Sequence, residues 1–150
     1  MQTVRRYWRI IFPIIVVLII WIFSSQTGDV SDSKSLKVAQ IFGLDNETAR
    51  TLAHFILFGS LGYTLCSFIK GLYPQAFPTL NLIAYPIIVV TVFGAIDEVH
   101  QITVIGRNAK IGEIFIDTLA GFSGILLYVA VFCFWRLFLR HRKAIKIQNA

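Results

Sequence analysis

The chain has 150 residues, of which 56% are hydrophobic and only 15% charged. Soluble domains are about a quarter charged, so this composition excludes an ordinary soluble domain, and the length allows a single domain over residues 1–150. The net charge of +6 does not indicate nucleic-acid binding, because basic residues gather beside apolar runs at both ends of the chain. Cys66 and Cys133 lie inside apolar runs, without metal-site or disulfide spacing.

Four long, largely uncharged stretches follow one another along the chain, each close to the about 20 residues that span a bilayer. We expect an all-α integral membrane fold, a four-transmembrane-helix bundle. The expected helices cover about 8–24, 50–70, 79–101 and 112–137, followed by a basic C-terminal tail at 138–150. The alternative for the first stretch is a cleaved signal peptide. We disfavour it because the residues near Ser24 lack a small-x-small cleavage site, and Trp8 and Trp21 are typical interfacial anchors.

The segment between the first two spans has its own helix signals. Lys34 to Phe42 is predicted as a short interfacial helix that ends at Gly43. Asp45 is a suitable N-cap for the next helix.

Lysine and arginine set the expected orientation. With both termini in the cytoplasm, nine of the 14 basic residues lie inside, as the positive-inside rule requires. All eight acidic residues then fall on the outer side.

Polar residues from three predicted helices converge at this outer face, where ionisable groups cost free energy and are often functional. The candidate ligand-binding residues are Arg50, His54, Asp97, Glu98, His100, Gln101, Arg107, Glu113 and Asp117. Spacings of three and four residues place Asp97, His100 and Gln101 on one helix face. Asp117 lies in an apolar run and needs a partner, and Arg107 is the nearest candidate. The alternative interpretation is a structural ion-pair network at the helix ends.

Four glycines predict close helix packing. Gly59 and Gly62 lie on the second predicted span, and Gly121 and Gly124 on the fourth. Small residues let membrane helices approach closely, so we expect these two surfaces to meet.

Several motifs together resemble the VanZ-like family over roughly residues 23–124. They are Phe23-Ser24-Ser25-Gln26, Ala53-His54-Phe55, Asp97-Glu98-x-His100-Gln101, Gly106-Arg107 and Glu113-x-x-x-Asp117-x-x-x-Gly121. The sequence departs from the family at residues 102–106, which lack the usual aromatic residue and proline, and at Glu113, where Asp is usual. The resemblance implies a small multi-pass protein of the bacterial plasma membrane, linked to the cell envelope and to resistance against teicoplanin-type glycopeptides.

Two functions stay open at this point. The first is an envelope protein that binds or protects a lipid-linked ligand at the outer face. Its partners would be membrane lipid and a cell-wall precursor or glycopeptide antibiotic, without nucleic acid. The second is a membrane enzyme acting on a lipid-linked substrate, with catalytic candidates Asp97, His100, His54 and Asp117. A divalent metal held by His54, His100 and acids is a variant of the second function, but no zinc-type motif is present, so we expect no cofactor and no metal site. Transport is disfavoured because the middle of every predicted span is apolar. The sequence does not predict the oligomeric state.

Overall fold

In the computed structural model, residues 2–73, 80–108 and 110–148 are described, and the regular secondary structure of this part of the chain is entirely α-helical. Its helices are α1 (Gln2–Ser24), α2 (Gly28–Phe42), α3 (Asn46–Leu72), α4 (Leu80–Ile102) and α5 (Ile111–Gln148). Four segments are long and apolar enough to cross a membrane: Tyr7–Ser24, Asn46–Leu72, Leu80–Ile102 and Ile111–Arg142. The predicted all-α fold with four membrane spans is therefore confirmed.

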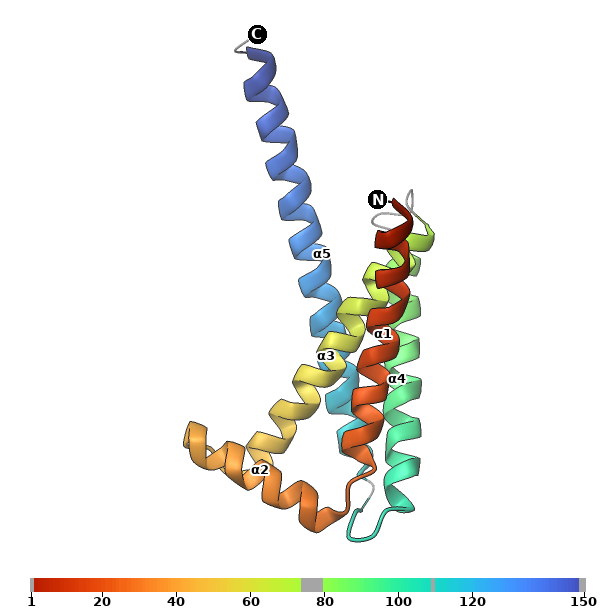
Figure 1. The fold of residues 1–150 in the computed structure, drawn as a ribbon, viewed down its shortest axis with the longest axis vertical. Coiled ribbons are helices and arrows are strands. Elements are labelled where there is room, and N and C mark those ends of the chain that lie inside the picture. The colour runs from red at the N-terminus through yellow and green to blue at the C-terminus, as the bar shows by residue number, and fades with distance from the viewer. Residues whose placement is uncertain (1, 74–79, 109, 149–150) are drawn as a thin grey trace.

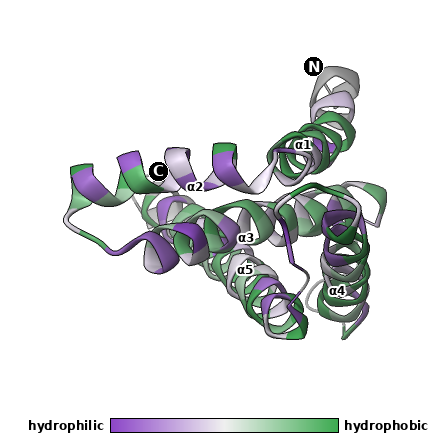
Figure 2. Cartoon of the chain, turned by 90° about the horizontal axis from the view of Figure 1, so that it is seen from below, coloured by the Kyte–Doolittle hydropathy of each residue, from purple (hydrophilic) through white to green (hydrophobic). Residues whose placement is uncertain are grey.

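The four spans alternate in direction, and both termini lie at the same end of the molecule (Figure 1). α2 lies across the opposite end, where the α4–α5 connection also lies; we call this the α2 end. Seen from that end, hydrophilic and hydrophobic turns alternate along α2, whereas the spanning helices are mainly hydrophobic (Figure 2). α2 therefore has the character of a helix lying in a membrane interface.

The helix ends differ from the prediction at the two termini. α1 begins at Gln2 rather than near residue 8, and α5 continues to Gln148, through most of the expected tail at 138–150; residues 149 and 150 lie outside the described part. The 38 residues of α5 correspond to about 57 Å of helix, nearly twice the hydrocarbon thickness. Its C-terminal part accordingly extends past the other helices (Figure 1).

α2 is longer than predicted, since it begins at Gly28 and not at Lys34. The serines of its first half suggested a loop because serine hydroxyls compete for backbone hydrogen bonds. Here they bond within the helix: Ser33 Oγ donates to Val30 O (2.9 Å) and Ser35 Oγ to Ser31 O (3.0 Å). Serine therefore does not interrupt the helix.

The predicted signals around residue 43 are confirmed. Gly43 ends α2 in the left-handed conformation (φ 66°), with its N–H bonded to Ala39 O. Asp45 is the N-cap of α3, because its carboxylate accepts from the backbone N–H (2.9 Å) and the hydroxyl (2.5 Å) of Thr48. These bonds lower the pKa of Asp45 below its ordinary value.

α3 and α5 cross at the predicted glycines. A Cβ on Gly62 would overlap the carbonyl oxygen of Gly121, and one on Gly124 would overlap that of Gly59. The backbones are therefore in direct contact, which only glycine permits. Phe58, Leu61 and Ala120 beside the crossing are buried and belong to the main apolar core. On the α2 side of this crossing, His54 of α3 lies beside Asp117 of α5.

Candidate functional site

A cavity of about 320 Å³ lies between α1, α2 and α3 at the α2 end. One part of its wall is apolar and is made by Ile20, Phe23, Val38, Ala49, Ala53, Ile56, Leu57 and Phe58. The other part is polar and is made by Ser24, Gln26, Ser31, Lys34, Ser35, Arg50, His54, Asp97 and Arg107. We call it the amphiphilic cavity, because both kinds of surface face one space.

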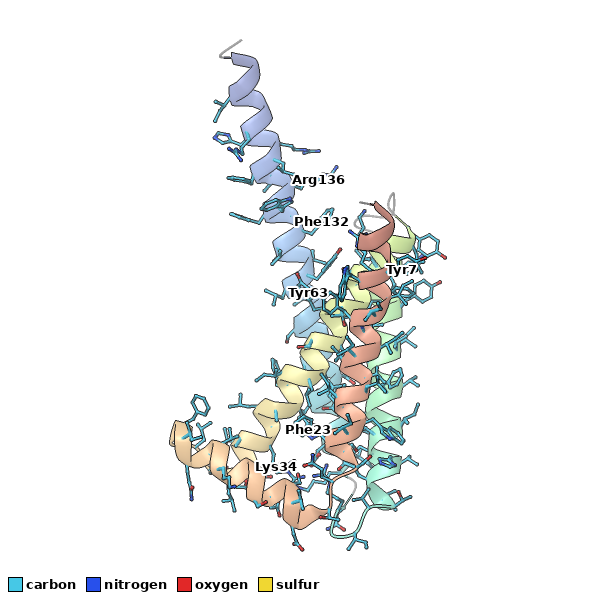
Figure 3. All side chains as sticks on the ribbon, viewed as in Figure 1. Tyr7, Phe23, Lys34, Tyr63, Phe132 and Arg136 are labelled. Carbon is cyan, nitrogen blue, oxygen red and sulfur yellow. The ribbon has the colours of Figure 1, made fainter. Side chains whose placement is uncertain are left out.

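Three cations line the amphiphilic cavity. Arg50 Nη1 lies 3.2 Å from Asp32 Oδ1, and Arg107 Nη1 donates to Ser31 Oγ at 2.8 Å, so both guanidiniums meet α2. The ammonium of Lys34 lies 5.8 Å from the ring centroid of Phe23, and Figure 3 shows these two residues facing each other from α2 and α1. Burial lowers the pKa of Arg107, and the neighbouring charge of Arg50 lowers it further. Two like charges are thus held close together, an arrangement that favours an anion between them.

The α4–α5 connection presents Arg107 to the cavity. Gly106 has a φ of 76°, a conformation that other residues rarely adopt. The preceding residue, Ile105, accepts a hydrogen bond from Gly28 N (3.0 Å), and a Cβ on Gly28 would overlap Gly106 O. The connection is therefore fastened to the start of α2, and this explains the Gly106-Arg107 motif.

His54 pairs with Asp117 across the α3–α5 contact. His54 Nδ1 donates to Asp117 Oδ1 at 3.0 Å, and Nε2 lies 3.8 Å from Glu113 Oε2. Asp117 is fully buried, and Gly94 of α4 leaves room for its side chain. The predicted Asp117–Arg107 pair is wrong: Asp117 faces α3 from the second turn of α5, whereas Arg107 turns toward α2.

Asp97 and Glu98 are both buried at the end of α4 but point to different neighbours. Gln101 Nε2 donates to Asp97 Oδ2 at 2.7 Å, as the four-residue spacing predicts. Glu98 Oε2 accepts from Lys110 N at 2.6 Å and so joins α4 to the start of α5. Asp97 lines the amphiphilic cavity, and Glu98 holds the connection.

Some buried polar atoms of this region have no hydrogen-bond partner among the described residues. They are Ser24 Oγ, Asp97 Oδ1, Glu98 Oε1, Arg107 Nε and Asp117 Oδ2. Three of these residues, Ser24, Asp97 and Arg107, line the amphiphilic cavity. Buried polar groups normally find partners, so these three suggest a ligand.

His100 is separated from the other candidates. Its ring stacks on Trp21 at 4.1 Å between centroids, and Nε2 lies 3.1 Å from Ser25 Oγ, at the seam between α1 and α4. His100 does not line the amphiphilic cavity with Asp97: its ring faces Trp21 and Ser25 of α1, whereas Gln101 bonds directly to Asp97.

A second cavity, of about 440 Å³, lies on the other side of Arg50 and His54 and is lined mainly by polar and charged residues. At its edge, Lys110 Nζ lies 3.9 Å from Glu113 Oε1 and 4.0 Å from Glu47 Oε1. In the part of the chain that the structure describes, no three His, Cys, Asp or Glu side chains are arranged to hold a metal ion.

Sequence reasoning missed the contribution of α1 and α2 to this site. Ser24, Ser31 and Lys34 line the cavity, yet their spacing resembles an ordinary polar loop. The Phe23-Ser24-Ser25-Gln26 motif was the only signal for this wall, since Ser24 is buried and Ser25 contacts His100.

A comparison of the sequence with models of known protein families shows which family the chain resembles. The VanZ/LLP1 family model matches residues 9–136, from α1 well into α5. The chain belongs to the VanZ/LLP1 family. This VanZ/LLP1 protein is a multi-pass membrane protein, as its four apolar helices also indicate. Searches of curated proteins and of solved structures gave no significant match.

Proposed function

We propose that this VanZ/LLP1 protein binds a lipid-linked, amphiphilic ligand at the outer face of the bacterial plasma membrane. The supporting observation is the amphiphilic cavity, in which Arg50, His54 and Arg107 share one space with Phe23 and Leu57. A polar head would lie among the charged residues, and the first carbons of its chain along the apolar wall. About 320 Å³ is at the lower end for small-molecule sites, so the rest of a lipid chain would stay in the bilayer.

The orientation in this proposal has both termini in the cytoplasm. It rests on the positive-inside distribution of lysine and arginine, since α2 and all eight acids are at the opposite end from the basic termini. A ligand of the outer leaflet, such as a lipid-linked cell-wall precursor, could then reach the cavity from the membrane. Holding such a ligand would protect it from a glycopeptide of the teicoplanin type, which is the proposed link to resistance.

Cavity filling tests the proposal. Ala53→Phe places a ring in the amphiphilic cavity, whereas Ala130→Phe adds the same ring to an exposed position of α5. Native mass spectrometry of the detergent-purified protein should show bound lipid on the chain and on A130F, and at least tenfold less on A53F. Equal lipid on both variants would overturn the proposal. Cells carrying A53F should also lose any glycopeptide resistance that the unmodified chain confers.

A membrane enzyme is the second candidate, and the His54–Asp117 contact favours it. A buried carboxylate on Nδ1 orients an imidazole so that Nε2 can accept a proton. His54 borders both cavities, so water in the polar one and a lipid head in the amphiphilic one would meet at its ring. His54→Gln should then abolish turnover of a bound lipid while lipid binding persists, as mass spectrometry of the lipid before and after incubation would show.

A further inference from the structure

Within the described part of the chain, the polar wall of the cavity presents both an unpaired hydrogen-bond donor and an unpaired acceptor to one ligand head. Arg107 Nε is a donor, and Asp97 Oδ1 is an acceptor; the residues that the structure describes leave both without a partner. Both side chains line the amphiphilic cavity. A ligand that satisfies both must therefore carry an acceptor and a donor.

The acceptor is anionic. Arg107 and Arg50 are fixed on Ser31 and Asp32 of α2, and Lys34 completes a group of three cations along the polar wall. Asp97 is the one carboxylate that lines this cavity within the described chain. Guanidinium groups match the planar oxygens of phosphate and carboxylate, and two of them on one wall suit the several oxygens of a phosphate.

The donor is a hydroxyl. Asp97 is only 4% exposed, and Gln101 already occupies its Oδ2, so the carboxylate needs one further donor at Oδ1. Ser24 is 2% exposed, and its unpaired hydroxyl lies on the same wall in the described structure. A neutral hydroxyl satisfies both groups and leaves the anion to the arginines. An ammonium donor would instead be repelled by the three cations.

We propose that the head bound in the amphiphilic cavity is a phosphate ester of a polyol, with the phosphate on Arg107 and Arg50 and a hydroxyl on Asp97 and Ser24. This inference rests on the proposed function, because it assumes that an amphiphile occupies the cavity. Two sources share this chemistry: a glycerophospholipid with a glycerol head and a polyprenyl phosphoryl sugar.

Lipids with the same dioctanoyl chains and different heads test the assignment. Phosphatidylglycerol has the phosphate and the hydroxyls, phosphatidylmethanol has only the phosphate, and diacylglycerol lacks the phosphate. Competed pairwise on the detergent-purified chain and measured by native mass spectrometry, phosphatidylglycerol should exceed phosphatidylmethanol, and phosphatidylmethanol should exceed diacylglycerol. Each step should be about tenfold, the size of one hydrogen bond to a charged group.

Two variants separate the two contacts. Arg107→Gln should remove the preference for phosphatidylmethanol over diacylglycerol. Asp97→Leu should remove the preference for phosphatidylglycerol over phosphatidylmethanol, because leucine has no hydrogen-bonding group, and should keep the preference for phosphate, which also shows that the variant is folded. Arg136→Gln, far along α5 from the cavity, should change neither ratio (Figure 3).

The outcomes distinguish the two proposals. If all three lipids bind equally and A53F displaces them, an amphiphile site stands and the head assignment is overturned. If phosphatidylglycerol and phosphatidylmethanol bind equally to the unmodified chain, the hydroxyl contact is overturned. If A53F leaves binding unchanged, the proposed function itself fails. Finally, competition between phosphatidylglycerol and a polyprenyl phosphoryl sugar identifies the source, since the tighter of the two is the better match.

Discussion

At the residue scale, the contact between His54 and the fully buried Asp117 needs the most explanation. A carboxylate with no exposed surface is costly within a membrane helix unless it is paired. His54 supplies one hydrogen bond from α3, and Glu113 lies on the other side of the same ring. The imidazole is thus held between two carboxylates of α5, and this joins two helices as well as orienting a candidate base.

Substitution of Asp117 tests the strength of this pair. Asp117→Leu leaves Nδ1 of a largely buried His54 without its acceptor and should lower the free energy of unfolding by about 2 kcal/mol. That exceeds the about 0.6 kcal/mol typical of interhelical hydrogen bonds in membranes. Asp117→Asn keeps an acceptor oxygen and should cost less than half as much. Unfolding in mixed micelles measures both, and equal losses would show that the charge, not the acceptor, matters.

A second residue-scale prediction concerns Asp45 and pH. Its pKa is lowered in the folded chain, so its stabilisation is fully present above the ordinary pKa of about 4 and is lost as the pH falls through the lowered value. Asp45→Ala should speed amide hydrogen exchange in the first turn of α3 at neutral pH. Asp45→Asn should keep the cap and make exchange, corrected for its intrinsic rate, insensitive to acid. Acid sensitivity in D45N would assign the effect to another group.

Among the elements, the α3–α5 crossing decides where the site residues lie. The two backbones touch at Gly59, Gly62, Gly121 and Gly124, and His54 of α3 lies beside Asp117 of α5 on the α2 side of this contact. That close contact lets a histidine of α3 reach an aspartate of α5. α2 then closes the cavity from the side, tied to the α4–α5 connection through Gly28.

Glycine substitution checks the crossing at this scale. Gly62→Ala adds a methyl group where the backbone of Gly121 stands, so the helices must separate, at a cost of about 1–3 kcal/mol. Gly112→Ala is the matched control on α5, because among the described residues no atom outside its own helix backbone lies within 4 Å of its added Cβ. The unfolding midpoint in detergent should fall for G62A and stay or rise for G112A. A similar fall for both would indicate a general intolerance of α3 and α5 to side chains.

At the scale of the whole molecule, the two cavities, with the three cations of the amphiphilic cavity, lie at one end, and both termini lie at the other. The outward faces of the spans carry exposed aromatic and aliphatic side chains, including Ile14 and Phe134, as expected for lipid contact. This uneven distribution of cavities and charged residues along the membrane normal suits a protein that acts on one leaflet.

Cysteine labelling tests which leaflet that is. In a chain whose two native cysteines are replaced, Ser33→Cys on α2 should react with a membrane-impermeant maleimide in intact cells. His141→Cys near the end of α5 should react only after permeabilisation; both positions are exposed in the structure. The opposite pattern would place the cavity in the cytoplasm and remove the proposed outer-leaflet ligand.

The sequence by itself determined the spans, the Asp45 cap, the end of α2 at Gly43 and the glycine contact, because these depend on local composition, short spacing and the absence of a side chain. It also predicted the set of polar residues. Only the tertiary structure decided their partners. Asp117 contacts His54 and not Arg107, and His100 contacts Trp21 and Ser25 of α1. The direction of a side chain across a helix interface depends on how neighbouring helices are rotated and tilted, and hydropathy and spacing do not contain that information. The apolar wall of the amphiphilic cavity, made by α1, α2 and α3, follows from the same packing.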